Sequence, residues 1–170
     1  MQPPQHSATA QIKIIAKSDP AWDYDRALEE IRYIEDTGGD TAQHPLFAYL
    51  HGRTRYDLDT PAHVGEELRT PRDYLRPGTV PVLWTCRRLR IAEVAECRDL
   101  GGRRGQLEAF RLAVTGVSGV DIEVPQGPAR SMTERAVEKI CEHVGATVVW
   151  EVGEAAMVAS EAPTASEKKP

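Results

Sequence analysis

Residues 80–86 read Val-Pro-Val-Leu-Trp-Thr-Cys and mark the point from which the fold can be worked out. The side chains at 80, 82, 84 and 86 are apolar or weakly polar, and this alternation predicts a strand with one buried face. Pro81 has no backbone N–H to donate, so we expect the strand to lie at a sheet edge. Helical spacing begins a few residues later, which predicts a mixed α and β fold.

The chain that follows this strand is predicted to be mostly helical. Apolar spacing predicts helices over residues 90–100 and 106–115, joined by a glycine-rich turn. A capping box from Ser131 to Glu134 predicts a third helix, which ends at Gly145. Residues 147–160 fit either a strand or a helix, and we favour a helix. In the first of these helices, the side chains expected to point inward are Ile91, Val94, Ala95 and Leu100.

The N-terminal half shows a short strand pattern over residues 10–17 and then a helix that begins at Asp19 and Pro20. A second short helix is expected to begin at His44. Residues 53–78 contain three prolines, which predicts a proline-broken loop segment with one short helix over residues 61–68.

Together these patterns predict one α+β domain of mostly short helices with a small sheet. The chain has 170 residues, of which 41% are hydrophobic, and this suits one self-supporting core. We assign residues 9–160 to the domain, residues 1–8 to a flexible arm and residues 161–170 to a flexible tail. Trp84, Trp150 and Phe110 are the expected core anchors.

The cysteine and histidine patterns give no sign of a disulfide framework, a metal site or a bound cofactor. The three cysteines, Cys86, Cys97 and Cys141, are odd in number, and no pair has C-x-x-C spacing. The histidines show no H-x-x-x-H or H-E-x-x-H spacing. The N-terminus lacks a signal-peptide pattern, and no apolar run is long enough to cross a bilayer. We therefore expect a protein of the cytoplasm without membrane contact.

Motifs of catalysis are also missing from the sequence. Residues 101–105 are glycine-rich and basic, but they lack the Gly-Lys-Ser/Thr of a phosphate-binding loop. Residues 116–119 read Gly-Val-Ser-Gly, without the spacing of a nucleophile elbow. The sequence predicts that the protein is not an enzyme.

Charge is distributed unevenly along the chain. Residues 1–68 carry a net charge of −6, residues 69–111 carry +5 and residues 112–170 carry −4. Every cation of the middle block is arginine, which suits ion pairing at interfaces. The opposite charges could meet within one chain, between copies of it, or on nucleic acid. As an interaction surface we select four basic residues facing two acidic ones: Arg87, Arg88, Arg103 and Arg104, with Asp57 and Asp59.

A helix-turn-helix offers an alternative, nucleic-acid-binding interpretation. The helices over 90–100 and 106–115 would be joined by five residues, and the second would enter a major groove with arginines on the phosphates. The turn is longer than usual for this motif, and the chain is acidic overall, whereas DNA-binding proteins usually carry a basic surface. Nucleic acid is therefore not the favoured partner.

The second half of the chain resembles small morphogenesis proteins of tailed bacteriophages. The resemblance covers about residues 80–170 and is carried by three stretches: Val-Pro-Val-Leu-Trp-Thr-Cys-Arg-Arg-Leu-Arg-Ile-Ala-Glu from residue 80, Leu-Glu-Ala-Phe-Arg-Leu-Ala-Val-Thr-Gly-Val from residue 107, and Val-Gly-Glu-Ala-Ala-Met-Val-Ala-Ser-Glu from residue 152, followed by Glu-Lys-Lys from residue 167. Such families include tail assembly chaperones and minor virion or connector components.

The resemblance implies a non-enzymatic structural or assembly protein that works through protein–protein contacts. Its implied partners are copies of itself or other phage structural proteins, met in the host cytoplasm during assembly or in the virion. It assigns no functional residue, since such families act through surfaces. A nucleic-acid-binding regulator and a phage-encoded inhibitor of a host system remain the alternatives.

Overall fold

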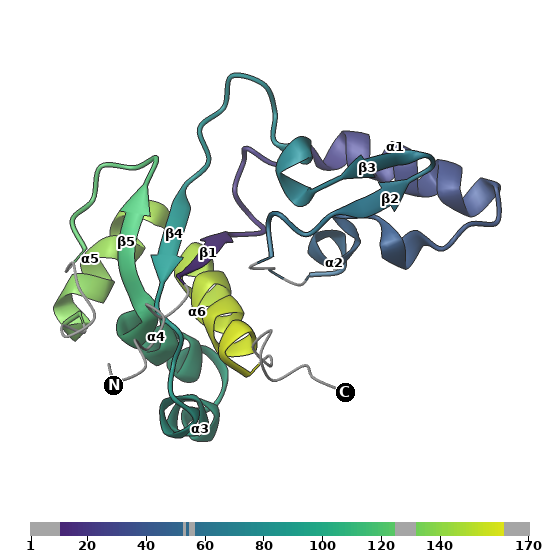
Figure 1. Cartoon of the computed structure of the whole chain (residues 1–170). Coiled ribbons are helices and arrows are strands. Elements are labelled where there is room, and N and C mark those ends of the chain that lie inside the picture. The colour runs from purple at the N-terminus through teal and green to yellow at the C-terminus, as the bar shows by residue number, and fades with distance from the viewer. Residues whose placement is uncertain (1–10, 53, 55–56, 125–131, 162–170) are drawn as a thin grey trace, which may run out of the picture.

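The computed structural model describes residues 11–52, 54, 57–124 and 132–161, and these form one α+β body (Figure 1). The α+β prediction is confirmed. The expected arm at 1–8 and nearly all of the expected tail at 161–170 lie outside the described residues. Two hydrophobic clusters divide the body into a main lobe and a small lobe.

The main lobe contains an antiparallel sheet of three short strands, β1 (Ile12–Ile15), β4 (Leu83–Cys86) and β5 (Val114–Ser118), in the order β1-β4-β5. The expectation that the strand after residue 80 lies at the sheet edge is wrong, because β4 is central. The reason is that Pro81 precedes the first paired residue, so its missing N–H interrupts no ladder. Val80 correspondingly points to solvent, with 74% of its surface exposed.

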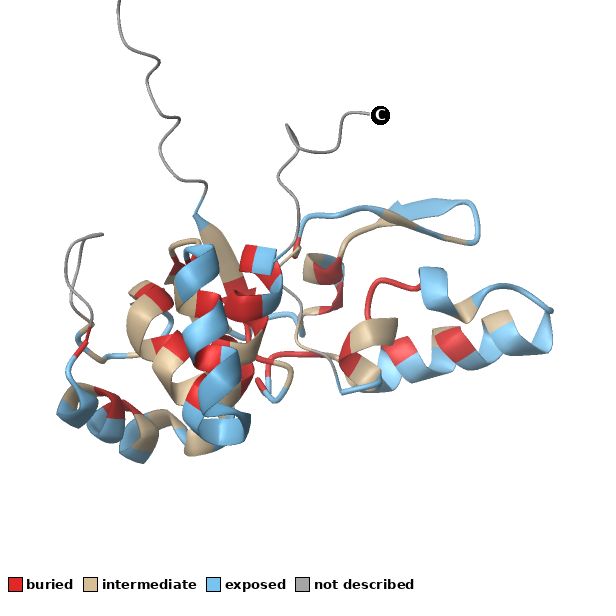
Figure 2. Ribbon diagram, turned by 90° about the horizontal axis from the view of Figure 1, so that it is seen from below, coloured by how far each residue is buried: buried red, intermediate tan, exposed pale blue. Residues whose placement is uncertain are grey.

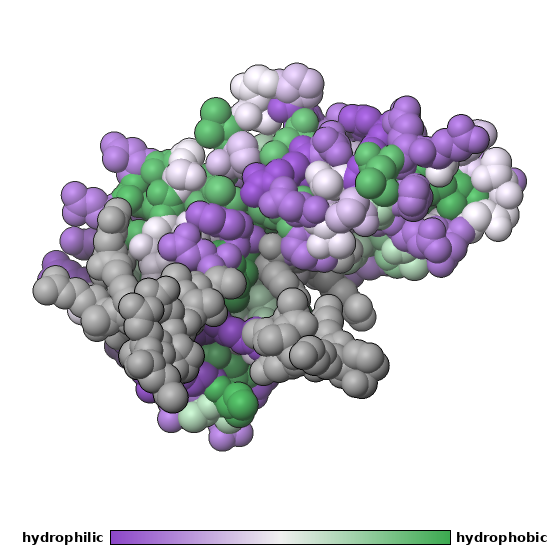
Figure 3. Space-filling view, in the orientation of Figure 1, coloured by the Kyte–Doolittle hydropathy of each residue, from purple (hydrophilic) through white to green (hydrophobic). Residues whose placement is uncertain are grey.

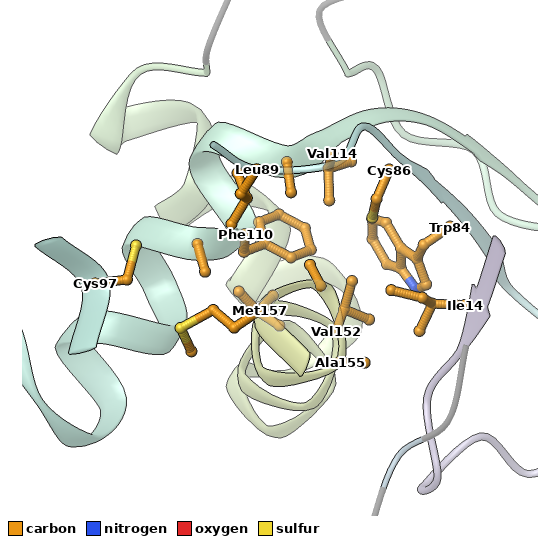
Figure 4. Packing of buried hydrophobic residues seen from close by; sticks show 14 of the residues in the cluster. Ile14, Trp84, Cys86, Leu89, Cys97, Phe110, Val114, Val152, Ala155 and Met157 are labelled. Atoms are coloured by element: carbon orange, nitrogen blue, oxygen red, sulfur yellow. The ribbon is translucent and has the colours of Figure 1, made fainter. Parts of the chain in front are cut away.

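Four helices complete the main lobe: α3 (Ile91–Leu100), α4 (Gly102–Ala113), α5 (Glu134–Val144) and α6 (Ala146–Glu161). Figure 4 shows Trp84 of the sheet, Phe110 of α4 and Val152 of α6 converging on one apolar interior. Trp84 and Phe110 are fully buried and stack edge to face with their ring centroids 5.2 Å apart. Their predicted role as core anchors is confirmed, as is the helix over 147–160.

Two glycines let the helices of the main lobe approach closely. A Cβ at Gly153 of α6 would lie 2.0 Å from the carbonyl oxygen of Gln106 in α4. A Cβ at Gly105 of α4 would lie 2.1 Å from the carbonyl oxygen of Cys97 in α3. Both distances are far below van der Waals contact, so the α3–α4–α6 packing depends on side-chain-free positions.

The small lobe consists of α1 (Tyr24–Asp36), α2 (Phe47–Leu50) and the hairpin of β2 (Ala62–Val64) and β3 (Glu67–Arg69), with 3₁₀ turns at Thr41–Gln43 and Pro71–Tyr74. Its core is small and contains three large aromatic rings, those of Trp22, Tyr49 and Tyr74. Figure 2 shows its few buried positions flanked by exposed ones, whereas the main lobe gathers its buried residues between its helices.

Asp19 ties the two lobes together where the chain passes between them. Its carboxylate, which is largely buried, accepts hydrogen bonds from the backbone N–H of Ala21 at 2.8 Å and of Val82 at 2.9 Å. Asp19 was expected to begin a helix, but α1 begins later, with Asp23 as its N-cap. The acid at 19 instead joins the two segments that connect the lobes.

Other local predictions are corrected by the structure. Residues 61–68 contain the β2–β3 hairpin in place of a short helix, because Gly65 adopts the positive φ of 65° that the tight turn needs. The third predicted helix begins at Glu134 with Thr133 as its N-cap, and Ser131 lies outside the described residues.

The glycine run at 101–105 was expected to form a five-residue turn. Instead α3 and α4 are joined by Gly101 alone, at a φ of 69°, and residues 102–105 form the first turn of α4. The inward positions of α3 also differ from expectation. Val94 and Cys97 are buried, while Ile91 is 89% exposed because it stands at the first turn, beyond the reach of the core.

Candidate interaction surfaces

A cluster of polar side chains in the small lobe resembles a catalytic arrangement. His44 is only 1% exposed, and its Nε2 lies 2.8 Å from a carboxylate oxygen of Glu30. The same carboxylate accepts a hydrogen bond from Tyr74 at 2.5 Å and is paired with Arg69.

The hydrogen bonds of His44 show why this cluster is structural. Its Nδ1 accepts the backbone N–H of Leu46 at 3.1 Å, so the proton sits on Nε2 and is donated to Glu30. No imidazole lone pair is left to act as a base. Burial lowers the pKa of His44, which keeps the ring neutral. The cluster therefore joins α1, the hairpin and the 3₁₀ turns, and offers no reactive group.

The arginines chosen from the sequence lie in different environments. Arg87 forms a two-pronged ion pair with Glu93 of α3, at 2.8 and 2.9 Å, and this hydrogen bonding lowers the pKa of Glu93 to about 2. Arg88 is half-buried beside it. Asp59 is engaged by Arg72 of the same lobe at 2.6 Å. These local pairs already use much of the charge that was expected to face a partner.

Arg103 and Arg104, although adjacent, serve two different surfaces. The guanidinium of Arg103 lies over the Trp150 ring of α6, 3.9 Å from its centroid. Arg104 lines a groove between α4 and α5 instead. Asp57 of the small lobe lines the same hollow as Trp150. The six selected residues thus do not form one surface, and their contact with a partner stays a prediction.

A groove lies between the two lobes and has a volume of about 840 Å³. One wall is the outer face of α6, where Thr147, Glu151, Glu154 and Val158 follow one another at helical spacing. The opposite wall comes from α2 and the segment that follows it. Lys17 bridges the lobes at one end by donating to the carbonyl of Gly52 at 2.9 Å.

Trp150 is the largest apolar side chain of this groove. It was expected in the core, but it is half-buried in the groove wall, because it lies on the side of α6 opposite to Val152. Its indole Nε1–H is shielded from solvent and has no hydrogen-bond partner among the described residues. The indole N–H of Trp84 in the main core is in the same state, so the unpaired N–H of Trp150 does not by itself mark a binding point.

The acids of the groove are held in place by neighbours in the chain. Glu151, itself largely buried, accepts hydrogen bonds from the backbone N–H and the hydroxyl of Ser18 at 3.1 and 2.8 Å. Glu154 accepts from Arg98 at 3.1 Å and from Gln106 at 3.4 Å. The sequence signal for this wall was the helical spacing of Thr147, Glu151, Glu154 and Val158. These residues lie between the apolar positions of the same helix.

The second groove lies between α4 and α5 and has a volume of about 620 Å³. Apolar side chains from both helices and from the end of α3 form its floor, and charged side chains form its rims. Figure 3 shows apolar surface among the hydrophilic side chains of the main lobe, including a patch at the lower end, over α3. Ile91 and Leu100 are the exposed large apolar residues of that helix.

The described part of the chain contains neither a metal-ligand cluster nor a membrane-spanning helix. No group of three or more His, Cys, Asp and Glu side chains among the described residues has the geometry of a metal site. None of the helices in the described ranges combines the length and apolar character needed to cross a bilayer.

Comparison of the sequence and the fold with protein-family models, with curated proteins and with solved structures gives no match. The resemblance to phage morphogenesis proteins therefore stays a prediction from the sequence.

Proposed function

We propose that this protein is a non-enzymatic binding protein that takes part in the assembly of phage particles by holding a segment of another protein in the interlobe groove. The observation that carries the proposal is Trp150. This residue is partly exposed and is the largest apolar side chain that lines the groove. Tryptophan is enriched among the residues that contribute most to the binding energy of protein–protein interfaces.

The composition of the groove supports a polypeptide as its occupant. Apolar surface from Trp150 and Val158 lies beside hydrogen-bonding groups from both lobes, which matches the mixture of an apolar centre and a polar rim in protein interfaces. The buried Glu151 and the nearby Asp57 disfavour a polyanion such as DNA or RNA in this groove.

The helix expected to read DNA is also poorly placed for that role. Ala109, Phe110 and Ala113 of α4 are buried, and α6 packs along the helix through the close contact at Gly153. A recognition helix must expose one long face to enter a major groove. The assignment to phage assembly, in the host cytoplasm or in the virion, rests on the resemblance of residues 80–170.

Affinity capture with a groove variant tests the proposal. The tagged wild-type chain and a Trp150→Ala chain would be expressed in cells that produce phage particles from the genome encoding the protein, and captured proteins would be quantified by mass spectrometry. We expect particle proteins to be enriched with the wild-type chain and reduced at least about tenfold with the variant, because a central tryptophan contributes upward of ~2 kcal/mol to binding.

Tyr33→Ala is the matched control. Tyr33 is an aromatic residue of α1 that is 70% exposed and does not line the groove. The control should capture the same proteins as the wild-type chain. Equal capture by the wild-type and Trp150→Ala chains, or no enrichment of particle proteins with either, would contradict the proposal.

A further inference from the structure

The groove between α4 and α5 has an apolar floor built from three helices. Leu100 ends α3, Leu107 belongs to α4, and Val137 and Cys141 belong to α5. Leu100 is 44% exposed and Cys141 is half-buried, so part of this floor is open to solvent. Covering it would remove apolar surface from water, which favours an occupant.

The two rims of this groove carry opposite charges. On the α4 side stand Arg104, Arg111 and Glu108, which together leave this rim with a net positive charge. On the α5 side stand Glu134, Glu138 and Glu142, spaced four residues apart and therefore aligned along one face of the helix. Arg111 is paired with Glu108 of its own helix.

The remaining rim charges are available for a partner. Arg104, Glu138 and Glu142 are exposed and form no ion pair within the part of the chain that the structure describes. Arg104 thus offers one unpaired cation on the basic rim, opposite two unpaired anions on the acidic rim.

We infer that this groove is a self-association surface, on which a second copy of the chain docks about a twofold axis. In such a pair the basic rim of one copy faces the acidic rim of the other, and the same contact occurs twice. A polyanion would be repelled by the three glutamates of α5, and an acidic or basic peptide would meet one rim of its own sign. A surface with both signs on opposite rims is complementary to itself.

This inference deepens the proposed function, because it names a second copy as one partner of the assembly protein. It uses a different groove from the one around Trp150 and can be tested on the purified chain. A failure here therefore leaves partner capture through the interlobe groove standing, and a failure of capture leaves the self-association intact.

Charge reversal gives a test in which loss and restoration are both predicted. The masses of the wild-type, Arg104→Glu and Glu138→Arg chains would be measured by light scattering over a range of protein concentrations. We expect the wild-type chain to be dimeric. Each single reversal should raise the dimer dissociation constant at least about tenfold, because the twofold axis applies each repulsion twice.

Mixing the two variants should restore the dimer. In the mixed pair each glutamate of the Arg104→Glu chain faces an arginine of the Glu138→Arg chain, so both contacts become attractive again. The double variant, with both changes in one chain, should also be dimeric. Arg32→Glu, an exposed reversal on α1 in the small lobe, is the matched control and should behave as the wild-type chain.

The alkylation rate of Cys141 provides a second readout, because charge changes at distant sites would not alter the exposure of this thiol. The other two thiols, Cys86 and Cys97, are buried, so alkylation of the folded chain reports on Cys141. Its labelling should slow as the protein concentration rises through the dimer range, and should not slow for either single-reversal variant. A wild-type chain that stays monomeric up to about 100 μM, or a mixture that restores neither mass nor protection, would overturn the inference.

Discussion

Replacing Gly153 by alanine should open the main lobe at its tightest helix contact. The added Cβ would lie 2.0 Å from the carbonyl oxygen of Gln106 and 2.8 Å from its carbonyl carbon. Ordinary contacts lie near 3.5 Å, so α4 and α6 would have to separate by roughly 1.5 Å or bend. Both helices are bound by buried neighbours along their length, which leaves little room for adjustment.

The expected magnitude follows from two opposing effects. Overpacking of this kind costs about 3 kcal/mol. Replacing glycine within a helix returns about 1 kcal/mol through higher helix propensity. The free energy of unfolding should therefore fall by about 2 kcal/mol.

Urea unfolding followed by circular dichroism measures this change. With a slope of about 2 kcal/mol per molar urea, the midpoint should drop by about 1 M. Ala95→Gly, at an exposed position of α3, measures the propensity effect alone in the reverse direction. A Gly153→Ala chain as stable as the wild-type chain, or more so, would refute the close approach of α4 and α6.

Other predictions concern the lobe junction and two polar contacts. Asp19→Ala should lower the free energy of unfolding by about 3 kcal/mol in urea titrations, because it leaves two backbone N–H groups without their acceptor. Stability measured against pH should fall first below pH 6.5, because burial holds the pKa of His44 under that value and the unfolded chain binds the proton more readily. A second fall is expected below pH 4.5, because burial raises the pKa of Glu30 less than its hydrogen bonds lower it; a stability that is flat from pH 7 to 4 would contradict both steps. Arg87→Ala should shift the carboxyl resonance titration of Glu93 upward from about 2, and no shift would show that the ion pair does not form in solution.

The fold could be predicted from the sequence wherever a single periodicity dominates. The helix α5 and the helix α1 each present one apolar face, and both were recovered with their ends displaced by only a few residues. The strand β4 was recovered, but its place in the sheet was not. A proline argues for an edge only when it falls within the paired residues, and the sequence does not show where pairing begins.

Long-range contacts explain most of what the sequence did not reveal. The glycines at 105 and 153 read as helix-weakening residues, and only the packed structure shows that each admits a neighbouring backbone. The Glu30–His44–Tyr74 cluster joins residues up to 44 positions apart, and no local pattern signals it. The roles of these residues are set by tertiary contacts, which local sequence propensity does not reveal.

The candidate surfaces, too, could be predicted from the sequence only in part. Charge alone drew attention to Arg103 and Arg104, but it could not show that the two side chains lie at different grooves. Trp150 was expected inside because tryptophan is apolar. The core face of α6 is occupied by small residues such as Ala155 and Ala156, so the large ring lies on the opposite face.

The central claim, that the interlobe groove binds another protein, is tested most directly by the size of the species that contains the chain in particle-producing cells. Lysates would be separated by size-exclusion chromatography and the chain located by immunodetection, for the wild-type and Trp150→Ala chains in parallel. The proposed function predicts that the wild-type chain elutes in a complex larger than its own dimer, and that Trp150→Ala moves to the position of the purified protein. Elution of the wild-type chain at the position of the purified protein would contradict it.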